Sequence, residues 1–260
     1  AQRGFSLIEL MVSMVLSMLI MGAILILFLD ITRTNDEMAK TNAQIENGRF
    51  AIQLLQDDIA HAGFWAGYVP FFDDLTSSDV VTGTPPLVTG TPRAVPDPCA
   101  QDVGLWNAQY KDNVLGIPVQ VFGAALTGCT MTGLKSGTNV LVVRHASLDT
   151  GCVGPATCFQ TTFCAAEMPA YWLGSGATNT LRGRDCTTVT GARRYISNIY
   201  YIREDAGIPT LMRLEFGNPT PQPLIEGVED FRVELGIDDE SKTGEAVDYS
   251  VAVDFGTDPA

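Results

Sequence analysis

Apolar residues fill the first part of the chain almost without a break from Ser6 to Leu29, and Glu9 is the one charged residue among them. About 25 residues in a helix rise roughly 37 Å at 1.5 Å per residue, which is enough to cross a bilayer with some tilt. The pattern therefore predicts a membrane-length helix. A lone carboxylate in such a helix is costly, so Glu9 is expected to have a functional partner.

Beyond Leu29 the apolar positions become sparse but keep a helical spacing. An isoleucine or methionine recurs at every seventh position, namely Ile31, Met38, Ile45, Ile52 and Ile59, and the nearby Leu55 and Ala62 extend this stripe. No proline occurs before Pro70, so we expect one helix from about residue 6 to about residue 62. The stripe is expected to pack on a sheet, and a coiled coil is the alternative.

Turn-rich stretches and short strand patterns follow the helix. Residues 67–99 are rich in Pro, Gly, Thr and Asp and predict a loop, and much of the chain up to Cys186 has a similar composition. The clearest β signal comes from residues 194–203 and 210–216, which flank a short Gly-containing turn and predict a hairpin. Further strands are expected within residues 117–122, 139–145, 224–238 and 247–255. A long helix followed by an antiparallel sheet is an α+β fold.

Three interpretations of the amino terminus compete. A secretory signal would have a shorter apolar core followed by a small-residue cleavage site, and no such site follows Leu29. A plain membrane anchor explains the length of the apolar stretch but not Glu9. The third interpretation places a cut before the helix, between Gly4 and Phe5, so that the helix stays in the mature protein. Arg3 favours a cytoplasmic start with the rest of the chain outside.

The residues Gly4-Phe5-Ser6-Leu7-Ile8-Glu9-Leu10 resemble the cleavage and methylation motif of type IV pilins and pseudopilins. This resemblance implies that a prepilin peptidase cuts after Gly4 and methylates the new terminal Phe5. It also implies that Glu9 pairs with the amino terminus of a neighbouring subunit. The chain begins at Ala1 without Met, so part of a basic leader is expected to be missing.

Four further stretches resemble the PilW type of minor pilin: residues 48–65, 141–144, 195–202 and 224–231. Major pilins often have a helix-breaking proline in the apolar segment, where this chain has only Gly22, and the family usually continues beyond Ala260. A closing strand is therefore expected to be absent, which would leave residues 247–255 as an unpaired edge. The implied fold is a pilin-like α+β fold with long disulfide-bearing loops.

The resemblance divides the chain into four parts: a leader remnant at residues 1–4, a transmembrane helix at 5–29, its amphipathic continuation at 30–66 and a periplasmic β-rich domain at 67–260. It implies a minor pilin stored in the bacterial inner membrane and then assembled at the pilus tip. The expected partners are other minor and major pilins, the prepilin peptidase, the inner-membrane assembly platform and a tip adhesin. A minor pseudopilin of type II secretion and a membrane-anchored binding protein that never polymerises are the alternatives.

The charge balance is acidic, with 16 Lys and Arg against 30 Asp and Glu and a formal net charge of −14. Nucleic-acid surfaces need clustered Lys and Arg, so a broad one is excluded. Arg193 and Arg194 form the best candidate for a local basic patch, although they are more simply interpreted as solvated residues that flank a strand.

The six cysteines all lie in the part of the chain placed outside the cytoplasm: Cys99, Cys129, Cys152, Cys158, Cys164 and Cys186. An even number in an exported domain indicates disulfides, although free buried thiols are the alternative. Six cysteines allow 15 pairings, and the spacing suggests only Cys152 with Cys158 and Cys164 with Cys186. No C-x-x-C pair occurs, which argues against zinc.

Catalytic chemistry is not expected. Asp57, Asp58 and His61 lie within about one helical turn, but we interpret them as a solvated polar face rather than a metal site. His145, at the end of an apolar strand, is interpreted as a satisfied polar cap. No G-x-S-x-G, H-E-x-x-H or P-loop motif occurs, so we predict a non-enzyme without cofactor or metal.

Overall fold

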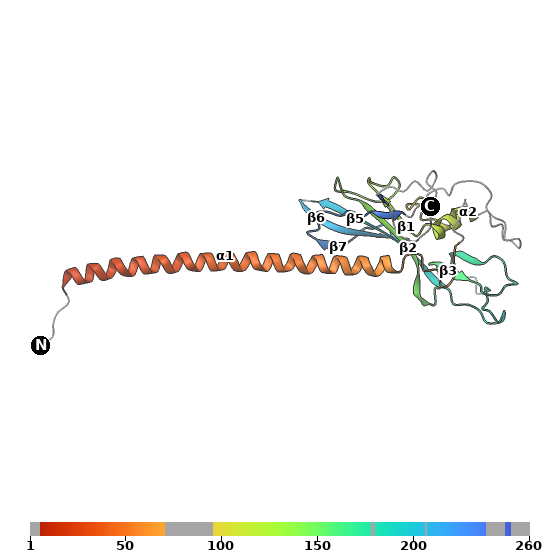
Figure 1. Cartoon of the computed structure of the whole chain (residues 1–260), viewed down its shortest axis with the longest axis horizontal. Helices are drawn as coiled ribbons and strands as arrows, with labels where there is room; N and C mark the ends of the chain where they lie inside the picture. The colour runs from red at the N-terminus through yellow and green to blue at the C-terminus, as the bar shows by residue number, and fades with distance from the viewer. Residues whose placement is uncertain (1–5, 71–95, 178–179, 206, 238–247, 251–260) are drawn as a thin grey trace. The chain divides into compact units, whose positions relative to one another are not determined.

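The computed structural model describes residues 6–70, 96–177, 180–205, 207–237 and 248–250 (Figure 1). The chain divides into two units, residues 1–50 and 51–260. In chain order the elements are α1 (Leu7–Ala60), the 3-10 helix η1 (Val103–Leu105), α2 (Ala108–Gly116), β1 (Val119–Phe122), β2 (Val140–Thr150), β3 (Thr157–Thr161), β4 (Tyr171–Ser175), β5 (Arg193–Asp205), β6 (Ile208–Glu215), β7 (Gln222–Glu226), β8 (Leu235–Ile237) and β9 (Asp248–Ser250). One long helix and an antiparallel sheet confirm the predicted α+β class.

The first unit contains the apolar part of α1, which is long and apolar enough to cross a membrane. Its large apolar side chains from Leu7 to Leu29 are exposed. The hydroxyls within this stretch bond to carbonyls one turn back, as Ser13 Oγ does to Leu10 O at 2.9 Å and Ser17 Oγ does to Ser13 O. A polar group that is satisfied within its own helix can enter lipid at low cost.

The second unit is built on β5, the strand with the most partners in the sheet. β5 pairs antiparallel with β2, β6 and β3, and β6 pairs in turn with β7 (Figure 1). β1 pairs with β2, β4 with β3, and β8 with β9 in a separate two-stranded sheet. The predicted hairpin is confirmed, because β5 and β6 pair from Asn198↔Glu215 to Asp205↔Ile208.

Both faces of the central strands are covered. Alternate residues of β5 point to opposite sides, so Tyr200 and Ile202 belong to one core and Ile199 and Tyr201 to another. The first core includes residues of the α1 end, and the second is lined by the segment between β1 and β2, including Leu126 and Met131. A strand covered on both faces is apolar at every position, which explains the continuous run at the start of β2.

The α1 end packs with only part of the stripe that we predicted: Leu55 and Ala62 pack against the first core, whereas Ile52 and Ile59 do not. Ile52 and Ile59 are 58% and 45% exposed, whereas Ala51 is 7% exposed and packs in the first core with Leu54, Leu55 and Ala62. Residues 51, 55, 58 and 62 follow the spacing of one helix face, and Ile52 lies about 100° around the helix from Ala51. The prediction that the seven-residue stripe packs on the sheet was therefore wrong for Ile52 and Ile59. Alanine and leucine residues form the contact instead.

Several elements were missed because their local signals are weak. The region up to Cys186 was expected to consist mostly of loops, but it contains α2, β3 and β4. α2 begins after Asn107, whose Oδ1 accepts from Tyr110 N at 2.8 Å, a capping contact that sequence reasoning overlooked. The described part of residues 247–255 is β9, and its pairing with β8 contradicts the expected unpaired edge. Residues 251–255 lie outside the described part of the chain.

Candidate functional site

The predicted site at the amino terminus is described from Ser6 onward, and Gly4 and Phe5 lie outside the described residues. Ser6 precedes the first turn of α1, and its backbone N–H donates to Glu9 Oε2 at 3.1 Å. The spacing Ser6-x-x-Glu9 is that of a capping box, in which the acid bonds back to the N–H of the capping residue. The Glu9 carboxylate is exposed and is positioned toward the end of the helix by this bond.

A second group of polar residues joins the α1 end to the sheet within the second unit. Asp58 accepts from His145 Nε2 on β2 at 2.9 Å. Asn198 Nδ2 and Tyr200 OH on β5 also donate to the Asp58 carboxylate, with each contact measuring 3.1 Å. The Asp58 and His145 side chains are only 12% and 9% exposed. Asp58 is therefore a buried carboxylate with three side-chain donors, and we call these four residues the Asp58 cluster.

The hydrogen bonds decide how the cluster ionises. Burial raises the pKa of Asp58, but the hydrogen bonds from His145, Asn198 and Tyr200 outweigh burial, so that its pKa lies below the ordinary value. Burial lowers the pKa of His145, but its contacts with Asp58 and with the Ala146 carbonyl outweigh burial and raise it above the ordinary value. Burial and the neighbouring Asp58 both raise the pKa of Tyr200, which therefore remains a donor.

Asp58 corrects one of our expectations. The polar group of Asp57, Asp58 and His61 was interpreted as a solvated face, but only Asp57 is strongly exposed. The donors to Asp58 come from residues 87 to 142 positions away, so no local pattern could reveal them. His145 is satisfied at both ring nitrogens, in agreement with its interpretation as a satisfied polar residue.

Backbone contacts hold the segment after α1 against β2. Gly63 has a φ of 74°, and a Cβ at this position would lie 3.3 Å from Pro118 Cγ, so a glycine is required here. Its N–H donates to Arg144 O at 3.0 Å, and Ala146 N donates to Phe64 O at 2.8 Å. The segment thus continues the ladder of β2 and leads into the buried Trp65.

Arg144 and Arg193 are held by neutral groups. Arg144 is 1% exposed, and its Nη1 donates to Ile117 O at 3.0 Å. Arg193 donates to the carbonyls of Ser147 and Leu148 and lies 5.6 Å from the centre of the Phe64 ring. Arg193 is therefore engaged at the α1–β2 junction, which leaves less of the proposed basic patch for an outside ligand.

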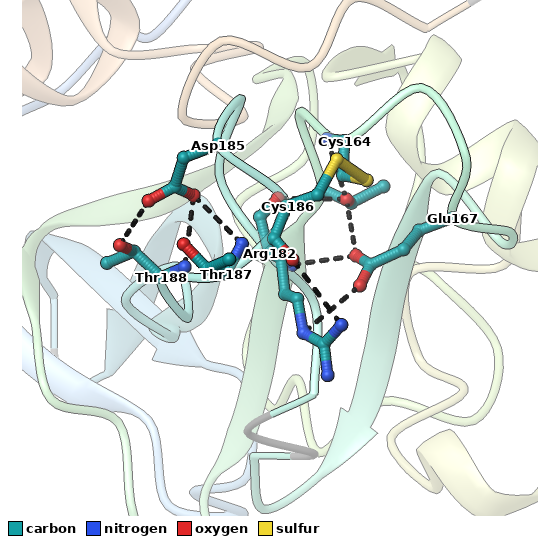
Figure 2. Close-up of a disulfide and its surroundings, with 8 residues drawn as sticks. Cys164, Glu167, Arg182, Asp185, Cys186, Thr187 and Thr188 are labelled. Carbon is teal, nitrogen blue, oxygen red and sulfur yellow. Dashed lines mark hydrogen bonds and ion pairs between the residues drawn. A yellow bond between two sulfur atoms is a disulfide. The ribbon is translucent and has the colours of Figure 1, made fainter.

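All six cysteines are paired, as Cys99–Cys129, Cys152–Cys158 and Cys164–Cys186. The last two are the pairs that the spacing suggested. Figure 2 shows the Cys164–Cys186 disulfide beside Glu167 and Arg182. Glu167 Oε2 accepts from Thr162 Oγ1 at 2.7 Å and from Arg182 N at 2.8 Å. The carboxylate therefore joins the segment before Cys164 to the segment before Cys186.

Asp185 is the other carboxylate of this loop, and it is also occupied by donors. Its Oδ1 accepts from the backbone N–H groups of Thr187 and Thr188, at 3.1 and 3.0 Å, and its Oδ2 accepts from Thr188 Oγ1 (Figure 2). These hydrogen bonds lower its pKa well below the ordinary range. Across the described ranges, no group of three or more His, Cys, Asp or Glu side chains is arranged to hold a metal ion.

Two family models match the chain. The prokaryotic N-terminal methylation motif matches residues 1–25, which include Gly4, Phe5, Glu9 and the start of α1. Type IV Pilus-assembly protein W matches residues 199–257, which begin within β5 and include β6, β7, β8 and β9. No curated protein and no solved structure gives a significant match.

Proposed function

We propose that this chain, a type IV pilus minor pilin of the PilW type, joins the tip or priming complex of the pilus and promotes pilus assembly. The observation that carries the proposal is the combination of two features. A methylation motif lies at the start of an exposed apolar helix, and a PilW region lies in the sheet at the other end of the sequence. The matched families are structural rather than catalytic.

Assembly begins with processing in this proposal. A prepilin peptidase cuts the Gly4–Phe5 bond and methylates the new amino group of Phe5. The apolar part of α1 then stays in the inner membrane as a single span, with the sheet domain in the periplasm. Exposed apolar side chains from Leu7 to Leu29 suit this state because lipid covers them, and neighbouring helices cover them after extraction into a filament.

Glu9 provides the pairing step. Among the residues that the structure describes, its carboxylate accepts from the nearby Ser6 N–H, which is a partial compensation for a charge that enters an apolar environment. The positively charged amino terminus of a neighbouring Phe5 offers a full counter-charge. Pairing in the filament would therefore stabilise the extracted state relative to storage in lipid.

The proposed partners are other minor and major pilins, the prepilin peptidase, the inner-membrane assembly platform and a tip adhesin. The match to Type IV Pilus-assembly protein W supports a pilus over a type II secretion machine. Deletion of the protein separates the two machines, because loss of pili with normal secretion supports the proposal and loss of secretion with normal pili contradicts it.

The first experiment is mass analysis of the amino terminus of the full chain, coexpressed with an active prepilin peptidase. We expect a mature chain that begins at N-methylated Phe5, and we expect Gly4→Leu to remain uncut. A second pilin in the same cells serves as the control for peptidase activity. An intact Gly4–Phe5 bond in cells that process the control pilin would contradict the proposal and favour a membrane-anchored protein that does not polymerise.

A further inference from the structure

The imidazole of His145 has a hydrogen-bond acceptor at each of its two nitrogens. Nε2 lies 2.9 Å from Asp58 Oδ1, and Nδ1 lies 3.0 Å from the carbonyl oxygen of Ala146. Neither a carboxylate nor a carbonyl oxygen can donate a proton. A neutral imidazole carries only one N–H, so it would turn a lone pair toward one of these oxygens. The imidazolium form donates to both.

The carboxylates nearest to His145 favour this form. Asp58 and Asp57 lie on α1, and the His61 ring lies 5.9 Å from the His145 ring. Tyr200 on β5 is a neutral donor to Asp58, and Arg213 on β6 is paired with Glu215. The charged group in direct contact with His145, across these described elements, is thus the Asp58 carboxylate, an anion.

The hydrogen bond between His145 and Asp58 lies where the end of α1 meets the sheet of the second unit. Asp58 lies in the last turn of α1, three residues before the hydrogen-bonded His61 and five before Gly63, where the chain joins β2. The remaining donors to Asp58 are on β5, the strand with the most partners. Loss of one His145 proton would remove the imidazolium charge and leave either the Asp58 carboxylate or the Ala146 carbonyl without its N–H donor, at the point where helix, β2 and β5 meet.

We propose that His145 is a doubly protonated latch that fastens the α1 end to the sheet and loosens this attachment when the imidazole loses a proton. The latch is a pH-sensitive device in the fold and does not depend on processing at Gly4. The direction of its pH dependence follows from the protonation states of His145 and Asp58. The attachment is complete while His145 is charged and Asp58 is ionised, and it weakens as the pH rises through the titration of His145.

The raised pKa of His145 supports an attachment that weakens as the pH rises. A histidine that is stabilised in its charged form by the native structure contributes stability that is fully present below its unfolded pKa and is lost as the pH rises through its folded pKa. The latch should therefore loosen on the alkaline side of the ordinary histidine value of 6.5.

The test uses the full chain in detergent micelles, labelled with ¹⁵N at histidine. The chain has only two histidines, so His61→Gln leaves a single signal and assigns His145. We expect both ring nitrogens of His145 to be protonated at pH 6 and the imidazole to lose a proton only on the alkaline side of 6.5. A neutral His145 tautomer at pH 6 would overturn the proposal.

Hydrogen exchange of residues 52–66 supplies the structural readout, after correction for the intrinsic pH dependence of exchange. We expect exchange to increase where His145 titrates, in wild type and in His61→Gln. His145→Gln should exchange rapidly at every pH and show no step. An absent step in wild type, or a step lost in His61→Gln, would overturn the latch. If His145→Gln does not fold, the titration of the wild-type chain still tests the latch.

Discussion

The indole Nε1 of Trp65 donates to the backbone carbonyl of Leu115 at 3.0 Å, a contact that joins the segment after α1 to the end of α2. Trp65 is 1% exposed, and its ring lies 5.5 Å from that of Phe159 and 6.2 Å from that of Tyr195. One side chain thus connects the helix exit, α2 and strands β3 and β5. Because its polar atom is buried and paired, its removal has two separate costs.

Trp65→Phe should lower the free energy of unfolding by about 1–3 kcal/mol, because it leaves the Leu115 carbonyl unpaired and removes ring volume from a packed core. Chemical denaturation of the full chain in detergent measures the change. Trp172→Phe is the matched control, since this indole on β4 is only partly buried and a smaller loss is expected. Equal losses in the two variants would show that the Trp65 hydrogen bond contributes little.

Asp58→Asn should destabilise the second unit by about 3 kcal/mol at neutral pH, since removal of one partner leaves a buried charge on His145. The acid side of the stability profile should change as well. The pKa of Asp58 is lowered by its hydrogen bonds despite burial, so its contribution is present above the ordinary value of 3.8 and is lost as the pH falls through the folded value.

Thermal melts between pH 3 and pH 7 test this pH dependence, and Asp57→Asn is the matched control because the Asp57 side chain is 82% exposed. We expect a flatter acid slope for Asp58→Asn and the wild-type slope for Asp57→Asn. A parallel profile for wild type and Asp58→Asn would show that the acid dependence arises elsewhere.

Neighbouring positions on α1 should respond in opposite ways to substitution. Ala51→Leu adds volume to a closed helix–sheet contact and should cost about 1–3 kcal/mol of stability. Ile52→Gln changes a side chain that is 58% exposed and should alter stability by less than about 0.5 kcal/mol. Denaturation curves of the two variants provide the comparison. A larger loss for Ile52→Gln than for Ala51→Leu would favour the sheet-facing stripe that the sequence predicted.

The helix shows how far a local pattern can be interpreted. Uninterrupted helical spacing predicted a single helix ending near residue 62, and α1 ends at Ala60. The predicted stripe was right for Leu55 and Ala62 and wrong for Ile52 and Ile59, which hydrophobicity alone favours. A close helix–sheet contact instead selects the small Ala51, and Asp58 lies on the same face. Its donors are distant in sequence, so the Asp58 cluster becomes visible only when β2 and β5 are in place.

The strands with strong sequence patterns were predicted, and those with weak patterns were missed. Residues 194–203 predicted β5 because tyrosine and isoleucine, which favour strands, recur along them. β3 and β4 are five residues each, so their pattern is too short to be distinguished from a loop. Their positions depend on pairing with each other and on the contact of Cys158 and Phe159 with Arg194 and Arg193 of β5.

Glu9→Ala should abolish incorporation into filaments while leaving insertion in the membrane intact, because the proposed pairing with a neighbouring amino terminus needs the carboxylate. Glu9→Gln should fail in the same way, since it keeps the shape but not the charge. Immunoblots of sheared pili and membrane fractions measure both steps. Glu37→Gln, at an exposed residue paired with Arg33, is the control. Normal amounts of Glu9→Ala protein in pili would refute the assigned role.

The three disulfides all lie between Cys99 and Cys186, whereas β5, β6 and β7 contain no cysteine. The β5–β6 hairpin is a local pairing and can form without any oxidant, because contacts that are close in sequence form early in folding. The crosslinks in the other loops form only when their thiols are oxidised. Maturation is thus expected to proceed in two stages, and the redox state of the compartment, rather than the pairing of strands, sets when the second stage is complete.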